Sequence, residues 1–173
     1  MPDTKSEQPL IVTARTDEHT FAFFDGLRQQ HFPPERNFLS AHLTLFHKLP
    51  GENLETISND LDQIALAATV AELSFTGWRG LGRGVAMSIE SKDLATVRAT
   101  IASRWANVLT AQDRQSFRPH ITVQNKVEPS VAKELLAKLS SHDHPASGWS
   151  TGLELWRYMG GPWEALKFYE FAR

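Results

Sequence analysis

The sequence predicts a fold of mixed helices and strands that is built from two similar lobes. Three observations predict it: strand-like and helix-like segments alternate, their order recurs in the second half, and one constant offset relates the two halves. A chain of 173 residues can bury a core, and its length suits one compact domain or two small packed lobes. We expect a disordered tail at 1–8 and a single bilobal domain at 9–173, with approximate halves 9–90 and 91–173.

The first half begins with a short apolar strand and a capped helix. Thr16 or Asp17 can cap this helix, and Pro33-Pro34 ends it because proline cannot continue a helix. Apolar runs between turn residues predict strands, and apolar residues three and four positions apart predict helices. The expected elements are a strand at 10–14, a helix at about 17–30, a strand at 42–49, a helix at about 53–68, and strands at 73–78 and 85–90 joined by the glycine-rich turn 80–84.

The second half repeats this order of elements. Asp93 can cap its first helix, which carries apolar residues at helical spacing. The expected elements are a helix from 94 to about 109, a strand at 120–127, a helix at about 129–139, a loop at 140–148, and a final hairpin with strands at 153–158 and 163–171.

A shift of 78 positions superposes the two halves. It places His42 on His120, Thr44 on Thr122, Lys48 on Lys126, Trp78-Arg79 on Trp156-Arg157, and Gly82 on Gly160. The alternative is a coincidence between two generic strand–helix units, but two His-x-Thr triplets and two Trp-Arg pairs at one offset argue against it. We therefore predict an internal duplication whose lobes are related by an approximate twofold axis.

Each half carries one His-x-Thr triplet in an expected strand. Because a strand has a period of two, His42 and Thr44 share one face, and His120 and Thr122 share one face of the other strand. If the lobes face each other, two imidazoles and two hydroxyls converge on one cleft. A lone histidine in a strand is more often a packed or solvent-facing residue, whereas two triplets in equivalent positions of a repeat indicate a functional site.

This set of groups suits phosphodiester chemistry without a metal. One histidine can take a proton from the attacking water or hydroxyl while the other gives one to the leaving oxygen, since the pKa of imidazole is near ~6.5. The threonine hydroxyls can hold the phosphoryl oxygens. Arg118, on the face of His120, is the expected cation at the phosphate, and Phe46 and Gln124, on the same strand faces, are candidates for contact with a base or another part of the substrate.

The segments His42-Leu43-Thr44-Leu45 and His120-Ile121-Thr122-Val123 resemble the two signature motifs of the 2H phosphoesterase superfamily. They are most similar to its bacterial branch of 2′,5′-RNA ligases, or RNA 2′,3′-cyclic phosphodiesterases. The resemblance covers the chain from Leu10 to about Phe171 and includes the Arg118-Pro119 lead-in to the second motif. The family's usual tail after the first motif is an aromatic residue and a glycine, and this chain carries His47 there instead.

The resemblance implies a duplicated, bilobal α+β fold in which each lobe has an antiparallel sheet with outer helices, and the active cleft lies between the lobes. It implies acid/base catalysis by His42 and His120 with no metal or other cofactor, and with Thr44 and Thr122 on the phosphate. Typical family substrates are 2′,3′-cyclic phosphates at RNA ends or related nucleotides, which are opened to 2′-phosphates. Reversible 2′,5′ ligation is also known in this branch.

Composition limits the classes of partner and compartment. The formal net charge of −2 lacks the basic footprint of a protein that grips long nucleic acid, so we expect recognition of an RNA terminus or a small cyclic nucleotide. The absence of cysteine excludes disulfides, thiolate catalysis and cysteine-ligated zinc. The polar start of the chain and the lack of an apolar run of ~18 residues predict a cytoplasmic protein that contacts no membrane. Because the duplicated lobes supply a pseudo-dimer, we expect a monomer that needs no protein partner.

The sequence is also compatible with other functions. A non-catalytic module that binds RNA ends or nucleotides would keep the same cleft, and a metal-dependent hydrolase would use histidine ligands. The segment His142-Asp143-His144 has the composition of a chelate, although a polar loop is a common setting for such residues. Trp78 and Trp156 favour core positions over base stacking, and His47 favours a supporting or surface position over catalysis because it falls on the opposite strand face from His42.

Overall fold

Helices and strands alternate along residues 5–173, which are the residues that the computed structural model describes. In chain order they are β1 (Leu10–Thr16), α1 (Glu18–His31), β2 (Leu43–Leu49), α2 (Leu54–Ala67), β3 (Ala71–Gly80), β4 (Val85–Glu90), α3 (Lys92–Arg104), β5 (His120–Gln124), α4 (Pro129–Ser140), β6 (Ser147–Tyr158) and β7 (Trp163–Glu170). Short 3-10 turns at Pro34–Arg36 and Gly51–Asn53 precede β2 and α2. None of the helices in this part of the chain combines the length and apolar character that a membrane crossing requires.

The strands form one antiparallel sheet in the order β1-β2-β5-β4-β3-β6-β7, and an additional pairing of β1 with β6 closes the first six strands into a ring. The predicted bilobal α+β fold is confirmed, but its two sheets are joined edge to edge. One junction is the pairing of β2 with β5, and the other is the pairing of β3 with β6. These contacts satisfy backbone N–H and C=O groups that two separate sheets would leave exposed at their edges.

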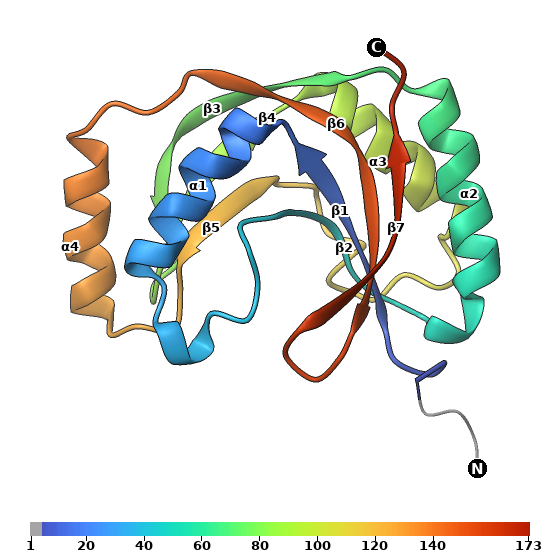
Figure 1. Ribbon diagram of the computed structural model, residues 1–173, viewed down its shortest axis with the longest axis horizontal. Coiled ribbons are helices and arrows are strands. Elements are labelled where there is room, and N and C mark those ends of the chain that lie inside the picture. Colours follow the sequence, from blue (N-terminus) through green and yellow to red (C-terminus); the bar gives the residue numbers. More distant parts are fainter. Residues whose placement is uncertain (1–4) are drawn as a thin grey trace.

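The helices lie on the outside of the two lobes. In Figure 1, α1 and α4 lie on the left and α2 and α3 on the right, with the strands between them. Helices α1 and α4 contact β5 and β3, whereas α2 contacts α3, β6 and β7. The repeat offset holds in these packed faces, because Ile57 and Leu61 of α2 and Leu135 and Leu139 of α4 are all buried.

The strand pairings follow the predicted duplication. Leu43 of β2 pairs with Ile121 of β5, and these two residues are themselves separated by the offset of 78. A twofold axis that passes between two antiparallel strands brings equivalent residues of the two halves opposite each other, as is seen for this pair. The hairpin turns also correspond, since Gly82 and Gly160 both adopt the left-handed backbone conformation, with φ of 83° and 86°.

Several element boundaries differ from those expected. Helix α3 is capped by the Ser91 side chain, which accepts a hydrogen bond from the Leu94 amide, and the helix ends at Arg104 rather than near residue 109. Strand β6 begins at Ser147, inside the expected loop at 140–148. Apart from the exposed Trp149, its first residues are small or polar and carry no apolar pattern, but their backbone pairs with β3.

The start of the described chain contacts the second half. Residues 5–8, within the expected disordered tail, form a turn, while residues 1–4 lie outside the described residues. The guanidinium of Arg157 donates a hydrogen bond to the Lys5 carbonyl, and the Lys5 ammonium lies 2.8 Å from a carboxylate oxygen of Glu164. This turn therefore lies against β6 and β7.

Candidate active site

The two His-x-Thr triplets meet where β2 pairs with β5. Leu43 pairs with Ile121, and the strands run antiparallel. Continued by one residue in each direction, this pairing sets Thr44 opposite His120 and His42 opposite Thr122. On the other face, Leu43, Leu45, Ile121 and Val123 are buried in the core. The His and Thr side chains are half-buried on the opposite face. Diagonal neighbours on adjacent strands lie roughly 7–8 Å apart, so both histidines can reach one phosphate-sized group.

Both catalytic candidates are anchored through the same ring nitrogen. Nδ1 of His42 lies 2.7 Å from the carbonyl oxygen of Ser40, and Nδ1 of His120 lies 2.9 Å from that of Arg118. Each acceptor is two residues before its histidine, so the two sites repeat this contact as well. When Nδ1 donates to a carbonyl, Nε2 of the neutral ring is left as the nitrogen that can accept a proton.

Arg79 distinguishes His120 from His42. Its Nη2 lies 3.1 Å from Nδ1 of His120. Because guanidinium is only a donor, Nδ1 can accept from Arg79 or donate to the Arg118 carbonyl, but not both at once. The sequence singled out Arg79 only as part of the repeated Trp-Arg pair. Its equivalent in the other half, Arg157, instead contacts the Lys5 carbonyl, so His42 lacks this cationic partner.

Both imidazoles are harder to protonate than free histidine. Burial lowers the pKa of His42 to about 4, the hydrogen bond to the Ser40 carbonyl opposes that shift, and the charges of Arg28, His120 and His47 add to it. Burial also lowers the pKa of His120, with the Arg118 carbonyl opposing it and the charges of Arg79 and His47 adding to it. His42 is therefore neutral over a wide pH range, as a proton acceptor must be.

Arg28 is a buried cation at the site that the sequence pattern did not indicate. Its side chain is 4% exposed, with Nη1 donating to the Thr122 carbonyl at 3.1 Å and Nε to the Asn37 side chain at 2.9 Å. Burial lowers the pKa of Arg28 to about 10, so it keeps its charge at neutral pH. Its position four residues after Phe24, on the apolar face of the first helix, is the signal that could have identified it.

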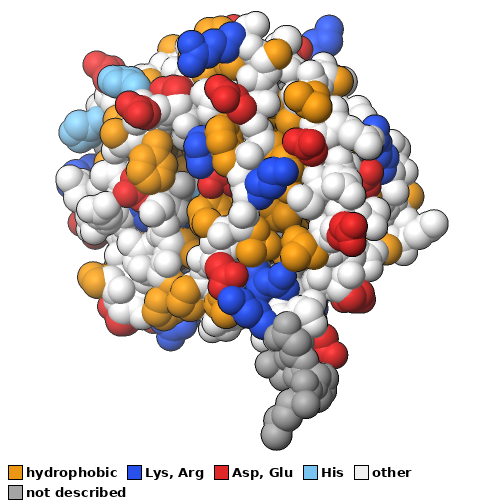
Figure 2. All heavy atoms as spheres, turned by 45° about the vertical axis from the view of Figure 1, so that its right-hand side comes forward, with side chains coloured by type: hydrophobic (Ala, Val, Ile, Leu, Met, Phe, Trp, Pro, Cys, Tyr) orange, Lys and Arg blue, Asp and Glu red, His pale blue; other side chains and the backbone are white. Residues whose placement is uncertain are grey.

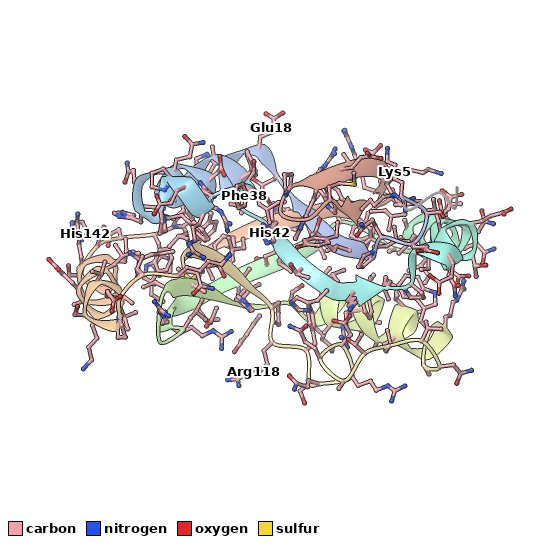
Figure 3. The ribbon with its side chains drawn as sticks, turned by 90° about the horizontal axis from the view of Figure 1, so that it is seen from below. Lys5, Glu18, Phe38, His42, Arg118 and His142 are labelled. Atoms are coloured by element: carbon pink, nitrogen blue, oxygen red, sulfur yellow. The ribbon has the colours of Figure 1, made fainter. Side chains whose placement is uncertain are left out.

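Arg118 does not occupy the position expected of a phosphate ligand. Its side chain is exposed, and Figure 3 shows it extending from the edge of the molecule. Only its backbone carbonyl contacts His120. Strand β5 begins at His120, so the period of two does not extend back through Pro119 to Arg118. Arg28 and Arg79 are the cations that lie close to the histidines.

Phe46 and Gln124 are buried in the structure, so neither has the surface needed for the substrate contact that the sequence suggested. They are 0% and 3% exposed. In β1, Val12 and Thr13 are neighbours, but their partners in β2 are Phe46 and Thr44, so β2 has one extra residue between the two pairs. In the same way Val85 and Ala86 of β4 pair with Gln124 and Thr122, which leaves one extra residue in β5. An extra residue reverses the alternation of strand faces. Both residues therefore turn toward the core beyond a bulge that recurs in the two lobes.

The same bulge changes the position of His47. Its side chain is exposed, and its Nδ1 lies 3.0 Å from a carboxylate oxygen of Asp113, a buried residue. That carboxylate also accepts hydrogen bonds from the backbone amides of His47 and Lys48. Burial alone would raise the pKa of Asp113, but these hydrogen bonds hold it below its ordinary value. His47 is thus anchored, and its charge acts on both catalytic candidates.

A cavity of about 540 Å³ opens beside His42. Its aromatic lining includes Phe21, Phe38, Trp156 and Trp163. The Trp163 ring lies 4.7 Å from the His42 ring between centroids, and the Trp156 indole donates to the Thr13 hydroxyl at 2.9 Å. In Figure 3, Phe38 and His42 lie near each other in the middle of the view. Trp156 therefore lines the cavity, whereas the sequence favoured a core position.

Within 5–173, no group of three or more His, Cys, Asp or Glu side chains is placed to hold a metal ion. In the segment that resembled a chelate, His142 Nδ1 contacts the Lys138 carbonyl and His144 Nδ1 contacts the Pro145 carbonyl. These two histidines are thus engaged with backbone oxygens.

Comparison with known families agrees with this geometry. The model of the 2′-5′ RNA ligase superfamily matches residues 16–162, most of the chain. The chain belongs to the 2′-5′ RNA ligase superfamily. Membership confirms the resemblance to the 2H phosphoesterases and indicates an enzyme of phosphoester chemistry. No curated protein matches the sequence.

Solved structures show that the superfamily fold extends over nearly the whole chain. Escherichia coli LigT complexed with 3′-AMP has a TM-score of 0.65 at 18% identity, covering 96% of this chain and 99% of LigT. LigT complexed with phosphate gives 0.64 at 19% identity with the same coverage. The protein TT0787 of Thermus thermophilus gives 0.58 at 17% identity, covering 94% of this chain and 97% of its own.

Proposed function

We propose that the protein is a metal-independent phosphodiesterase that opens 2′,3′-cyclic phosphates of RNA ends or nucleotides to 2′-phosphates. The observation that carries this proposal is the pairing of β2 with β5, which sets two anchored imidazoles and two threonines on one face. Superfamily membership supports phosphoester chemistry. The structures of LigT with 3′-AMP and with phosphate support a nucleotide substrate.

The proposed reaction is a single displacement at phosphorus. His42 accepts a proton from water as the water oxygen bonds to phosphorus, the bond from phosphorus to the 3′ oxygen breaks, and His120 gives that oxygen a proton. The products are a 2′-phosphate and a free 3′-hydroxyl. His42 suits the base role because burial keeps it neutral. The negative charge of a bound phosphate favours the protonated form of His120, which an acid requires.

The remaining groups hold the phosphate. The hydroxyls of Thr44 and Thr122 can donate to the phosphoryl oxygens and keep them in line between the histidines. The positive charges of Arg28 and Arg79 stabilise the negative charge that develops on the phosphoryl oxygens. With a 5′-hydroxyl in place of water, the same displacement joins two RNA ends through a 2′,5′ linkage, and its reversal cleaves that linkage.

The test is turnover of RNA oligomers that end in a 2′,3′-cyclic phosphate, with the position of the product phosphate determined by ³¹P NMR. We expect a 2′-phosphate, activity that persists in excess chelator, and a loss of roughly 10²–10⁴ in rate for His42→Ala and for His120→Ala. His19→Ala, an exposed histidine in α1, is the matched control. Loss of activity on chelation would support a metal-dependent enzyme, and binding without turnover would support a non-catalytic binding module.

A further inference from the structure

A pair of opposite charges, Arg15 and Glu154, lines the cavity beside His42. Thr44 pairs with Thr13 across β2 and β1, and Thr13 pairs with Glu154 across β1 and β6. Paired residues share a face, so these three side chains form one row. With strands ~4.8 Å apart, Glu154 lies roughly 10 Å from the threonine that faces the phosphate. Glu154 and its neighbour Arg15 both line the cavity.

The walls of this cavity are flat and aromatic. Trp163 stands at 56° to the His42 ring, and its centroid lies 6.0 Å from that of Trp156. The lining also includes Phe21 and Phe38, which are 40% and 58% exposed. Aromatic side chains of this kind bind the π-face of any nucleobase, so the walls favour a base without selecting which one.

The charged pair can select, because its carboxylate is held in place. Glu154 Oε1 accepts a hydrogen bond from Arg15 Nε at 2.6 Å, and the Arg15 guanidinium lies 3.6 Å from the centroid of the Phe168 ring. The Glu154 side chain is 17% exposed. Its second oxygen accepts no hydrogen bond from the residues described in 5–173, so an acceptor remains available to a ligand.

We propose that this cavity binds the nucleobase attached to the reacting phosphate, and that Glu154 selects bases with an exocyclic amino group. A carboxylate only accepts hydrogen bonds. Adenine, cytosine and guanine each carry an amino donor, whereas uracil presents carbonyl oxygens at its corresponding positions. Uracil has no amino group, and its N3–H donor lies between two carbonyl oxygens that repel a carboxylate, so uracil compensates the half-buried carboxylate less than the other bases do. The inference rests on the proposed function because it names the substrate class of that same site.

The experiment compares four 2′,3′-cyclic nucleotides on the wild type and on Glu154→Gln. We expect kcat/KM for the uridine substrate to be about tenfold or more below the values for the other three. In Glu154→Gln this difference should shrink, because an amide donates as well as accepts. Glu154→Asp keeps the acceptor and should keep the order of bases. Glu72→Gln, an exposed glutamate on β3, is the control and should behave like the wild type.

Affinities of the matching 2′-nucleotides, measured by calorimetry on the same variants, separate this inference from the proposed function. The same base order in affinity without any turnover would sustain the inference and overturn the proposed function. Turnover of all four nucleotides at equal rates, unchanged in Glu154→Gln, would overturn the inference alone. It is also overturned if none of the 2′-nucleotides binds.

Discussion

Single residues make the two histidines different although they occupy equivalent positions of the repeat. His42 packs beside the Trp163 ring, whereas His120 contacts the guanidinium of Arg79. Val85 is the residue equivalent to Trp163 by the offset of 78, and it cannot reproduce the aromatic contact. These neighbours place equivalent histidines in different surroundings, which is what the proposed reaction with one base and one acid needs.

Replacing Arg79 should change the titration of His120. The Arg79 charge lowers the pKa of His120, so Arg79→Gln is expected to raise that pKa toward 6.5. NMR titration of the imidazole Cε1 proton measures it directly. Arg79→Lys keeps the charge and should shift the pKa less. His42 should shift less than His120 and in the opposite direction, because Arg79 is not among the charges that act on it directly and the His120 charge lowers its pKa. An unchanged pKa for His120 in Arg79→Gln would contradict this role.

The lowered pKa of His42 should also make stability depend on pH. Above 6.5 the ring is neutral in both the folded and the unfolded chain, and between 6.5 and about 4 only the unfolded chain binds the proton. The free energy of unfolding should therefore fall as pH decreases through this window. Urea denaturation across that range should show a smaller decrease for His42→Gln than for the wild type. Equal decreases in the two proteins would exclude the shift.

At the scale of the strands, the alternation of side chains predicts the face of a residue only up to a bulge. The period of two correctly grouped His42 with Thr44 and His120 with Thr122, because both triplets precede the bulges. It failed for Phe46 and Gln124, which follow the bulges. A bulge depends on how two strands pair, and this pairing has no signal in either strand's own sequence. All four helices were predicted, since apolar spacing within one segment indicates a helix, but the cap and the end of α3 differ from those expected.

Phe46 gives a direct test of the bulge. Its ring packs against Trp105 and lies 4.6 Å from the Arg98 guanidinium. Phe46→Ala should lower the free energy of unfolding by about 3–5 kcal/mol, because it leaves a cavity in the core, and should leave KM unchanged in the folded protein. Phe46→Leu should lose less stability. Denaturant unfolding and steady-state kinetics measure the two effects, and a raised KM with unchanged stability would restore the substrate-contact interpretation.

At the scale of the whole molecule, the two halves share one sheet. Strand β1 of the first half lies between β2 and β6, so its backbone pairs with both halves of the chain. We propose on this basis that residues 9–173 fold as a single domain. On the face shown in Figure 2, Lys and Arg side chains are interspersed with Asp and Glu rather than gathered in one basic patch. This mixture agrees with an RNA terminus or a nucleotide as the substrate.

Duplication also explains why one site contains two histidines. The twofold relation brings residue 42 of one half and residue 120 of the other to the same pair of strands. The offset of 78 could be read from the sequence, so the meeting of the two His-x-Thr strands was predictable, while their catalytic role stays a prediction. Arg28, Glu154 and Trp163 have no equivalents of the same type in the other half, and only the packed structure brings them to the site.

A double-substitution cycle tests most directly whether the two lobes serve one reaction. We predict that His42→Ala and His120→Ala each lower kcat/KM for a 2′,3′-cyclic phosphate RNA end by roughly 10²–10⁴, and that the double variant is no slower than the worse single variant. Residues that act as a unit lose their joint effect when either is removed. Multiplied losses in the double variant, or full activity in either single variant, would contradict a shared two-histidine site.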